Sequence, residues 1–238
     1  MKIACWSGPR NISTALMRSW SSRDDTTVID EPFYSSYLIS TKLKHPMYKE
    51  IIKRYPSKND DIIKLLTSKN PNKSDIWYQK HMAHHILDFK NINFILSFEN
   101  TFLIRNPKKV IFSYIKKNKL NDAQELGYDQ QYRLLRFLQK NDKKFNVVDS
   151  DKLLNNPTLI LKKWCATLNI KFDNRMLTWE KGIHKNDGIW AKHWYDSVAN
   201  TTTFKNKPDQ KKEILEKKYI NIYNHCNKLY EKMLEFTL

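Results

Sequence analysis

The sequence predicts an α/β protein with a parallel β-sheet and helices on both faces. Short apolar runs alternate with amphipathic segments along the chain, which is the order of elements in a covered parallel sheet. No repeat, low-complexity tract or Gly/Pro-rich linker divides the 238 residues, and this length suits one domain with a large core. We therefore expect residues 1–238 to form a single domain.

The apolar runs and the helical periodicities predict the elements in order. The chain opens with the apolar run KIACW, the turn SGPRN and the amphipathic segment STALMRSW, which predict a strand, a loop and a helix. Further strands are expected at 26–30, 76–80, 101–105 and 146–148. Further helices are expected at 58–67, 107–117, 122–140 and 157–168. A Lys/Glu-rich stretch from about Pro208 to Phe236 has apolar residues at roughly helical spacing and predicts a C-terminal helical extension across the sheet.

Composition limits the classes of function. The formal net charge is +17, but the lysines are spread over the whole chain, which favours a general basic surface over a dedicated polyanion track and leaves both open. We expect no dedicated nucleic-acid binding. Three scattered cysteines fit neither a disulfide framework nor a metal site. No apolar run suits a membrane span or a signal peptide, so the expected location is the cytoplasm.

The first strand-to-helix turn is a candidate phosphate site. A tight loop that leads into a helix N-terminus directs unpaired N–H groups and partial positive charge at one point. Gly8 supplies backbone freedom there, Arg10 a cation, and Ser13 and Thr14 hydroxyl donors. The loop lacks the lysine and second glycine of an ATP-type phosphate loop, and an ordinary capped helix is an equal alternative.

A second motif follows a later strand. The run TFLIR ends at Arg105, and Asn106-Pro107 opens a helix that carries Ser113. Proline suits the first helical turn because its missing N–H would be unpaired there. Arg105 at the strand end and Ser113 two turns into the helix can share a face, so they could bracket a phosphate distant from the first one.

The segments SGPRNISTALMRS and IRNPKKVIFS resemble the two elements by which P-loop sulfotransferases bind the donor PAPS (3′-phosphoadenylyl sulfate). The segments NVVDSDKLLNNPTLILKKWCATLNIKF and DGIWAKHW are similar to later parts of that family. The resemblance implies a P-loop-like fold, PAPS as co-substrate and no metal. It implies that the first loop binds the 5′-phosphosulfate, that Arg105 and Ser113 bind the 3′-phosphate, and that a late loop closes over the nucleotide. The donor-binding residues implied are Gly8, Pro9, Arg10, Asn11, Ile12, Ser13, Thr14, Arg105, Ser113, Gly188, Trp190 and Lys192.

The sequence departs from the family pattern in two places. Residues 10–14 replace the common Lys-Ser-Gly-Thr-Thr core, so the planar guanidinium of Arg10 replaces a point charge. The late loop lacks the usual Arg-Lys-Gly lead-in and has Lys185 nearby. Trp190 and Trp194 suit stacking on adenine and suit buried anchors equally well. A further pair, Asp149 and Asp151, follows a strand and is expected to cap the next turn.

Sulfuryl transfer also needs positive charge on the leaving phosphate, which Arg10 and the loop amides would supply, and a base for the acceptor. Glu31, in IDEPFY, resembles the catalytic glutamate of the trehalose and tyrosylprotein branches of the family. His81, in YQKHMAHH, resembles the Lys-x-His base of the cytosolic branch. Their alternatives are a helix N-terminal carboxylate and a polar residue lining the cleft, and Glu31 is slightly favoured. His84 and His85 are expected beside the site or on the surface.

The sequence thus predicts a sulfotransferase that acts on a hydroxyl or amine of a small metabolite. Acceptor specificity is expected in stretches such as 35–70 and 115–140, which carry no recognisable motif. One rival is a small-molecule kinase of related fold, against which the missing loop lysine argues. The other rival is a catalytically silent protein that binds a nucleotide or a polyanion.

Overall fold

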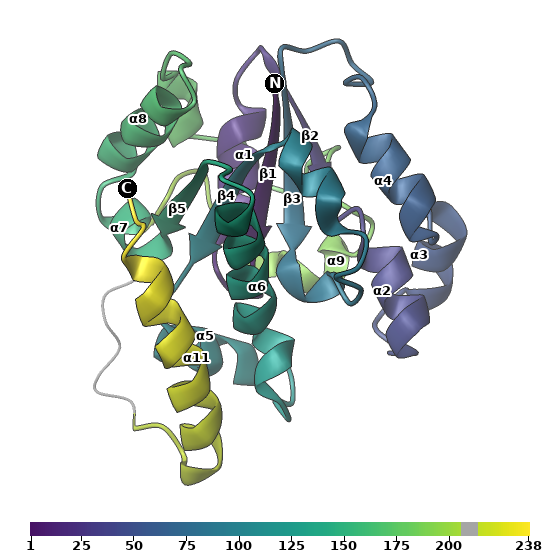
Figure 1. Ribbon diagram of the computed structural model, residues 1–238, viewed down its shortest axis with the longest axis vertical. Helices are drawn as coiled ribbons and strands as arrows, with labels where there is room; N and C mark the ends of the chain where they lie inside the picture. The colour runs from purple at the N-terminus through teal and green to yellow at the C-terminus, as the bar shows by residue number, and fades with distance from the viewer. Residues whose placement is uncertain (206–213) are drawn as a thin grey trace.

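The computed structural model describes residues 1–205 and 214–238, and a five-stranded parallel sheet forms its centre (Figure 1). The sheet order is β2-β3-β1-β4-β5. The strands are β1 Lys2–Ser7, β2 Thr26–Asp30, β3 Ile76–Met82, β4 Glu99–Ile104 and β5 Phe145–Asp149. Every predicted strand is present near its expected bounds, so the predicted fold class is confirmed.

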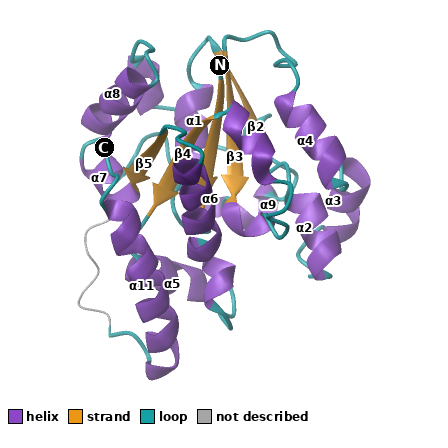
Figure 2. Cartoon of the chain, viewed as in Figure 1, coloured by secondary structure: helices purple, strands orange, loops and turns teal. Residues whose placement is uncertain are grey.

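Helices complete the two outer layers (Figure 2). The α-helices are α1 Ser13–Ser21, α2 Tyr34–Thr41, α3 Tyr48–Arg54, α4 Asn59–Thr67, α5 Pro107–Ile115, α6 Tyr128–Lys140, α7 Ser150–Asn155, α8 Pro157–Thr167, α9 Ala191–Trp194, α10 Asp196–Ala199 and α11 Ile220–Leu234. Short 3-10 helices are η1 Ala83–His85, η2 Ile92–Ser97, η3 Ala123–Leu126, η4 Asn174–Leu177 and η5 Lys217–Tyr219. No helix within residues 1–205 and 214–238 combines the length and apolar character that a membrane crossing requires.

The central strands β1 and β3 are buried on both faces, and β1 has the nearly continuous apolar sequence that such burial favours. Helices α1 and α8 pack on the face that carries Cys5, where Trp20 and Trp164 fill the core. Helices α4, α6 and α11 cover the opposite face, around Trp6 and Phe102. The sheet is therefore the middle of three layers (Figure 1).

The direction of the chain reverses beside β1, the central strand. After β1 the chain crosses to β2 at one edge and returns through β3, and it then continues through β4 to β5 on the other side. Open α/β sheets bind ligands at such a reversal, beyond the carboxyl ends of the strands. The loop after β1 and Arg105 after β4 flank this position.

The predicted helix at 122–140 was wrong as a single element. Gly127 has φ 76, in the left-handed region, and it separates the 3-10 helix η3 from α6. Asp122 and Glu125 form a capping box for η3, which gives this short turn its own N-terminus. The break matters because the turn at Leu126–Gly127 packs against the loop after β1.

The C-terminal extension is shorter than predicted. The expected start at Pro208 lies outside the described residues, and helix α11 begins only at Ile220. Ile214 is not helical and is 89% exposed. Helix α11 buries Cys226 and Met233 against the layer formed by α5 and α6. After α11, the Leu238 backbone N–H donates to the Val147 carbonyl and so extends the edge at β5.

Candidate active site

Four parallel strands bring the predicted site residues to the carboxyl end of the sheet. Glu31 follows β2, His81 lies near the end of β3, Gly8 follows β1 and Arg105 follows β4. Neighbouring strands are about 4.8 Å apart, and β3 lies between β2 and β1, so Glu31 stands roughly 10 Å from the loop after β1 across the sheet.

The backbone of the loop after β1 has the geometry of an anion site. Arg10 and Ile12 have φ values of 64 and 60, in the left-handed region that residues other than glycine rarely adopt. Such residues turn successive N–H groups toward one point, and anion-binding nests are built in this way. Helix α1 starts directly afterwards at Ser13, so its first N–H groups and its dipole add to the same site.

Two arginines meet at this loop. The Arg10 Nε donates to Ser113 Oγ at 2.9 Å, and Arg105 Nη1 donates to the Arg10 carbonyl at 2.9 Å. Burial lowers the pKa of Arg10, and the nearby Arg105 lowers it further. The Arg105 Nε is buried without a hydrogen-bond partner in the structure. Two cations and an unpaired donor at one point suit a bound anion.

The second motif lies against the first loop. Ser113 and Arg105, which were expected to bracket a phosphate distant from the one at the loop, both bond Arg10: Ser113 bonds its side chain and Arg105 its carbonyl. The two candidate phosphate sites are therefore adjacent.

Other loop residues hold the backbone in place. Asn11 is 1% exposed and its Nδ2 donates to the Leu103 carbonyl, while Ser150 Oγ donates to the Asn11 carbonyl. A Cβ on Gly8 would lie 2.2 Å from the Leu126 carbonyl oxygen, so glycine is needed for this close approach. Of the remaining loop residues, Ser13 is buried and Pro9, Ile12 and Thr14 are half-buried.

The two aspartates after β5 have different roles. Asp149 Oδ1 accepts from the backbone N–H groups of Asp151 and Lys152, so its predicted role as a cap is confirmed. Asp151 is no cap: its carboxylate lies 3.7 Å from Arg105 Nε and 3.3 Å from Lys109 Nζ. Asp151 thus partly balances the positive charge behind the loop.

Glu31 belongs to a buried charged cluster. Its backbone has φ 42, and its N–H donates to the Lys80 carbonyl at 2.9 Å. Its Oε1 lies 2.5 Å from Lys80 Nζ and accepts from the Tyr195 hydroxyl at 3.2 Å. Burial raises the pKa of Glu31 above its ordinary value, Lys80 works against the rise, and Asp30 adds to it. Such a carboxylate is suited to act as a base nearer neutral pH.

His81 lies on the opposite face of the sheet from Lys80, because side chains alternate along a strand. It is 1% exposed, stacks on Trp6 with ring centroids 4.2 Å apart, and its Nε2 pairs with Gln79 Oε1 at 3.2 Å. Burial lowers its pKa to about 3, and Lys80 contributes to the fall. The imidazole is therefore neutral and enclosed.

The two histidines of η1 lie among tyrosines beside the site. His85 is stacked between Tyr34, at 5.0 Å, and Tyr37, at 4.5 Å. His84 meets Tyr37 edge-on, with ring centroids 5.3 Å apart. Burial holds the pKa of both imidazoles well below the ordinary value, with a value of about 3 for His84. Both are neutral groups in an aromatic wall.

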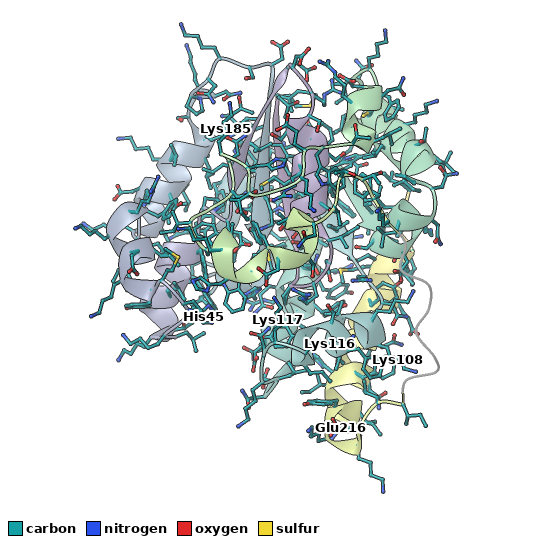
Figure 3. The ribbon with its side chains drawn as sticks, turned by 180° about the vertical axis from the view of Figure 1, so that it is seen from behind. His45, Lys108, Lys116, Lys117, Lys185 and Glu216 are labelled. Atoms are coloured by element: carbon teal, nitrogen blue, oxygen red, sulfur yellow. The ribbon has the colours of Figure 1, made fainter. Side chains whose placement is uncertain are left out.

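The late segment, Gly188–Tyr195, crosses the same carboxyl end of the sheet. Gly188 N–H donates to Asp30 Oδ2 at 2.9 Å, and a Cβ on Gly188 would lie 2.1 Å from the Trp190 ring. Trp190 is 1% exposed and packs on Tyr34 and Tyr55, which matches a buried anchor. Lys192 is exposed. Farther on, Asp196 lies 2.6 Å from Lys117, which Figure 3 shows beside this segment.

Sequence reasoning missed three important groups. Lys80 and Tyr195 surround Glu31, and Arg18 forms an ion pair of 2.7 Å with Asp187 in which both side chains are buried. An apolar strand that contains a lysine was the available signal for Lys80, since a buried lysine needs a partner. Nothing in the pattern around Arg18 or Tyr195 indicated a partner more than a hundred residues away.

Comparisons with known proteins agree with this architecture. A family model described as sulfotransferase domain matches residues 1–225. Similar solved structures are a sulfotransferase domain from the curacin biosynthetic pathway (15% identity, 94% of this chain and 96% of that one, TM-score 0.53) and a sulfotransferase from Alicyclobacillus acidocaldarius (9%, 99% and 96%, TM-score 0.53). At these identities the structures support the fold alone.

Two curated relatives come from Arabidopsis thaliana. Branched-chain-amino-acid aminotransferase-like protein 2 is 29% identical over 96% of this chain and 40% of its own length. Branched-chain-amino-acid aminotransferase-like protein 1 is 32% identical over 85% of this chain and 36% of its own length. The chain thus spans about two fifths of the relatives it matches. With the family match covering nearly all of its residues and the fold in agreement, the chain belongs to the sulfotransferase domain family.

Proposed function

We propose that residues 1–238 work as one sulfotransferase domain that moves a sulfuryl group from PAPS to a hydroxyl or amine of a small acceptor. The observation that carries the proposal is the basic loop: Arg10 is held by Ser113, and the buried Nε of Arg105 makes no hydrogen bond and has only the Asp151 carboxylate at 3.7 Å. Left-handed residues and a helix N-terminus direct N–H groups to the same point. These residues fit a ligand with several phosphate oxygens.

The residues of the chain then divide the work. PAPS supplies an activated sulfuryl group, and its transfer leaves adenosine 3′,5′-bisphosphate. Arg10 and the loop N–H groups would stabilise negative charge as it grows on the leaving phosphate. Arg105 and Ser113 would bind the 3′-phosphate. Glu31 would take the proton from the acceptor as its oxygen or nitrogen bonds to sulfur.

We assign the base to Glu31 rather than to His81 on two grounds. The side chain of Glu31 is 11% exposed and its pKa is raised, so its carboxylate can both meet an acceptor and hold its proton. His81 is enclosed by Trp6 and Gln79, and its pKa of about 3 makes a protonated imidazole costly.

We further propose that the aromatic wall beside Glu31 receives the acceptor. Tyr34 is the first residue of α2, and its N–H donates to the Glu31 carbonyl. Burial raises the pKa of Tyr34, and the charge of Glu31 raises it further. Helix α2, which carries Tyr37, and the 3-10 helix η3, which carries Glu125, both contact η1. The stretches 35–70 and 115–140, in which specificity was expected, thus approach one another beside the base.

Two measurements test the function. Thermal-shift screening should show stabilisation by PAPS and by adenosine 3′,5′-bisphosphate that exceeds stabilisation by AMP, ATP or GTP. Mass spectrometry of reactions with PAPS and a panel of small alcohols, phenols and amines should reveal a product heavier by one sulfuryl group. Donor binding without any product would favour the silent binder, and a preference for ATP would favour the kinase.

The aminotransferase activity lies outside the proposal, and a cellular location lies within it. The aminotransferase in the names of the Arabidopsis relatives is not part of it, because this chain spans only about two fifths of their length. A cytoplasmic location is part of it, and the three cysteines, all free and buried, suit a reducing compartment.

A further inference from the structure

Lys80 is a buried junction between the base and the late segment. Its ammonium lies 2.8 Å from Asp30 Oδ1, 2.5 Å from Glu31 Oε1 and 2.7 Å from the Tyr195 hydroxyl oxygen. An ammonium has three N–H donors and no acceptor, so these partners use its full capacity. The Lys80 side chain is 1% exposed, so it is shielded from bulk solvent. The direction of each N–H is therefore determined by the other two bonds.

Asp30 and Tyr195 extend the junction to the late segment. Asp30 Oδ2 accepts from the Gly188 backbone at 2.9 Å and from the Tyr195 hydroxyl at 2.7 Å. The Tyr195 oxygen accepts in turn from Trp190 Nε1 at 3.2 Å. Tyr195 carries one hydroxyl proton and has two carboxylates within reach, Asp30 and, at 3.2 Å, Glu31.

The geometry points to Asp30 and Tyr195 as positioning residues that act through Lys80 to orient the Glu31 carboxylate and to tie the segment Gly188–Tyr195 to the base. This inference rests on the proposed function, in which Glu31 is the base. The base and the late segment then form one structural unit. The Glu31 carboxylate points at the acceptor only when Tyr195 makes its hydrogen bonds to the cluster. Neither residue needs to touch the donor or the acceptor.

The charges around Glu31 give the unit a measurable signature. The groups that face Glu31 are Asp30 from β2, Lys80 from β3, Tyr34 from α2 and Tyr195 after α9. Two carboxylates share one ammonium, so Asp30 raises the pKa of Glu31, whereas the Tyr195 hydroxyl bond lowers it. Burial raises the pKa of Tyr195 well above its usual range, and Asp30 adds to this rise, so Tyr195 stays a donor.

The test measures the pKa of Glu31 directly by NMR of carboxyl-labelled glutamate, with the Glu31→Gln variant for assignment. Tyr195→Phe should raise this pKa, because it removes a hydroxyl donor that the Glu31 and Asp30 carboxylates share. Asp30→Asn should lower it, because it removes a neighbouring negative charge. Shifts of roughly half to one pH unit are expected in each direction. A purely structural role would not move the two variants in opposite directions.

Tyr55→Phe is the matched control. The Tyr55 hydroxyl accepts from Ile189 N–H at 3.2 Å in the same segment, but the hydroxyl bonds neither Lys80 nor a carboxylate of the cluster. Shifts of equal sign in the two variants, no shift in either, or an equal shift in Tyr55→Phe would overturn the inference. If Asp30→Asn does not fold, the comparison of Tyr195→Phe with Tyr55→Phe tests the inference by itself. The NMR measurement needs neither donor nor acceptor. A failure of this inference can therefore be distinguished from a failure to detect sulfuryl transfer.

Discussion

At the scale of single residues, Arg105 has one nitrogen that makes a structural hydrogen bond and one buried nitrogen that makes none. Its Nη1 supports the loop through the Arg10 carbonyl, while its buried Nε has Asp151 only at 3.7 Å. A buried donor without a hydrogen bond costs about 1–3 kcal/mol, and a phosphate oxygen would remove that cost. Arg105 is thus the residue at which donor binding can be tested most directly.

Arg105→Ala should weaken binding of adenosine 3′,5′-bisphosphate about 10- to 100-fold, since a charge-assisted hydrogen bond is worth about 1.5–3 kcal/mol. Binding of AMP, which lacks the 3′-phosphate, should change much less. Calorimetry with both nucleotides measures the difference. Lys108→Ala, at an exposed position two residues into α5, controls for loss of a nearby charge. If wild type binds both nucleotides equally, the assignment of Arg105 and Ser113 is wrong.

Glu31→Gln should reduce turnover about 10²–10⁴-fold while donor affinity stays the same, because the amide keeps the shape but cannot accept a proton. Only the ionised carboxylate is a base, so activity should fall as the pH drops through the pKa of Glu31. Burial raises that pKa, so the acidic limb of the pH–rate profile should lie above about 4.3. His81→Asn is the comparison, and a larger loss there than in Glu31→Gln would transfer the role of base to His81.

At the scale of elements, the loop after β1 depends on a turn that belongs to another segment. Gly127, in the left-handed conformation, allows η3 to end and α6 to start, and its position brings Leu126 against Gly8. The Asn11 side chain, bonded to the Leu103 carbonyl, holds the other side of the loop. The loop after β1 is therefore shaped from both sides by backbone groups distant in the sequence.

Gly8→Ala should destabilise the protein by about 1–3 kcal/mol, as other overpacking substitutions do. The new Cβ would lie 2.2 Å from the Leu126 carbonyl oxygen, and this neighbour is backbone that cannot rotate away. Either the turn or the loop must shift, so affinity for adenosine 3′,5′-bisphosphate should fall as well. Thermal unfolding and calorimetry measure the two effects, and an unchanged melting temperature would contradict the predicted contact.

At the scale of the whole molecule, burial of neutral imidazoles makes stability depend on pH. His81 is 1% exposed and its pKa is about 3 in the folded state. In the unfolded chain the same group has a pKa near 6.5. Between these values the unfolded state binds a proton that the folded state does not. This contribution to stability is complete above about pH 6.5 and is lost as the pH falls toward 3.

The free energy of unfolding should therefore fall between pH 7 and pH 5, by about 2 kcal/mol from His81 alone. His81→Gln should show a correspondingly smaller loss, although its stability at pH 7 will differ from wild type because the ring stacks on Trp6. Urea unfolding at the two pH values measures this. His193→Gln, at an exposed position, is the control and should keep the wild-type loss. Equal losses in all three proteins would show that His81 takes up its proton in the folded state.

Much of the fold followed from local patterns. The run KIACW predicted a strand because a strand buried on both faces is nearly continuously apolar, and that property can be read without knowing its neighbours. Asp149 was predicted as a cap for the same reason, since a cap bonds only the residues next to it. A prediction failed where a single residue interrupted a helical periodicity: Gly127 divides the helix expected at 122–140.

By itself the sequence determined the candidates for the site: a basic turn before a helix, an arginine and a serine after a later strand, and an acidic residue after β2. Only the tertiary structure decided which of them meet. It joined Arg10 to Ser113, enclosed His81, and surrounded Glu31 with Lys80, Asp30 and Tyr195. The physical reason is range. Capping, turns and periodicity act over a few residues, whereas buried charges are paired by sheet order and layer packing, which bring together groups as distant as Asp30 and Tyr195.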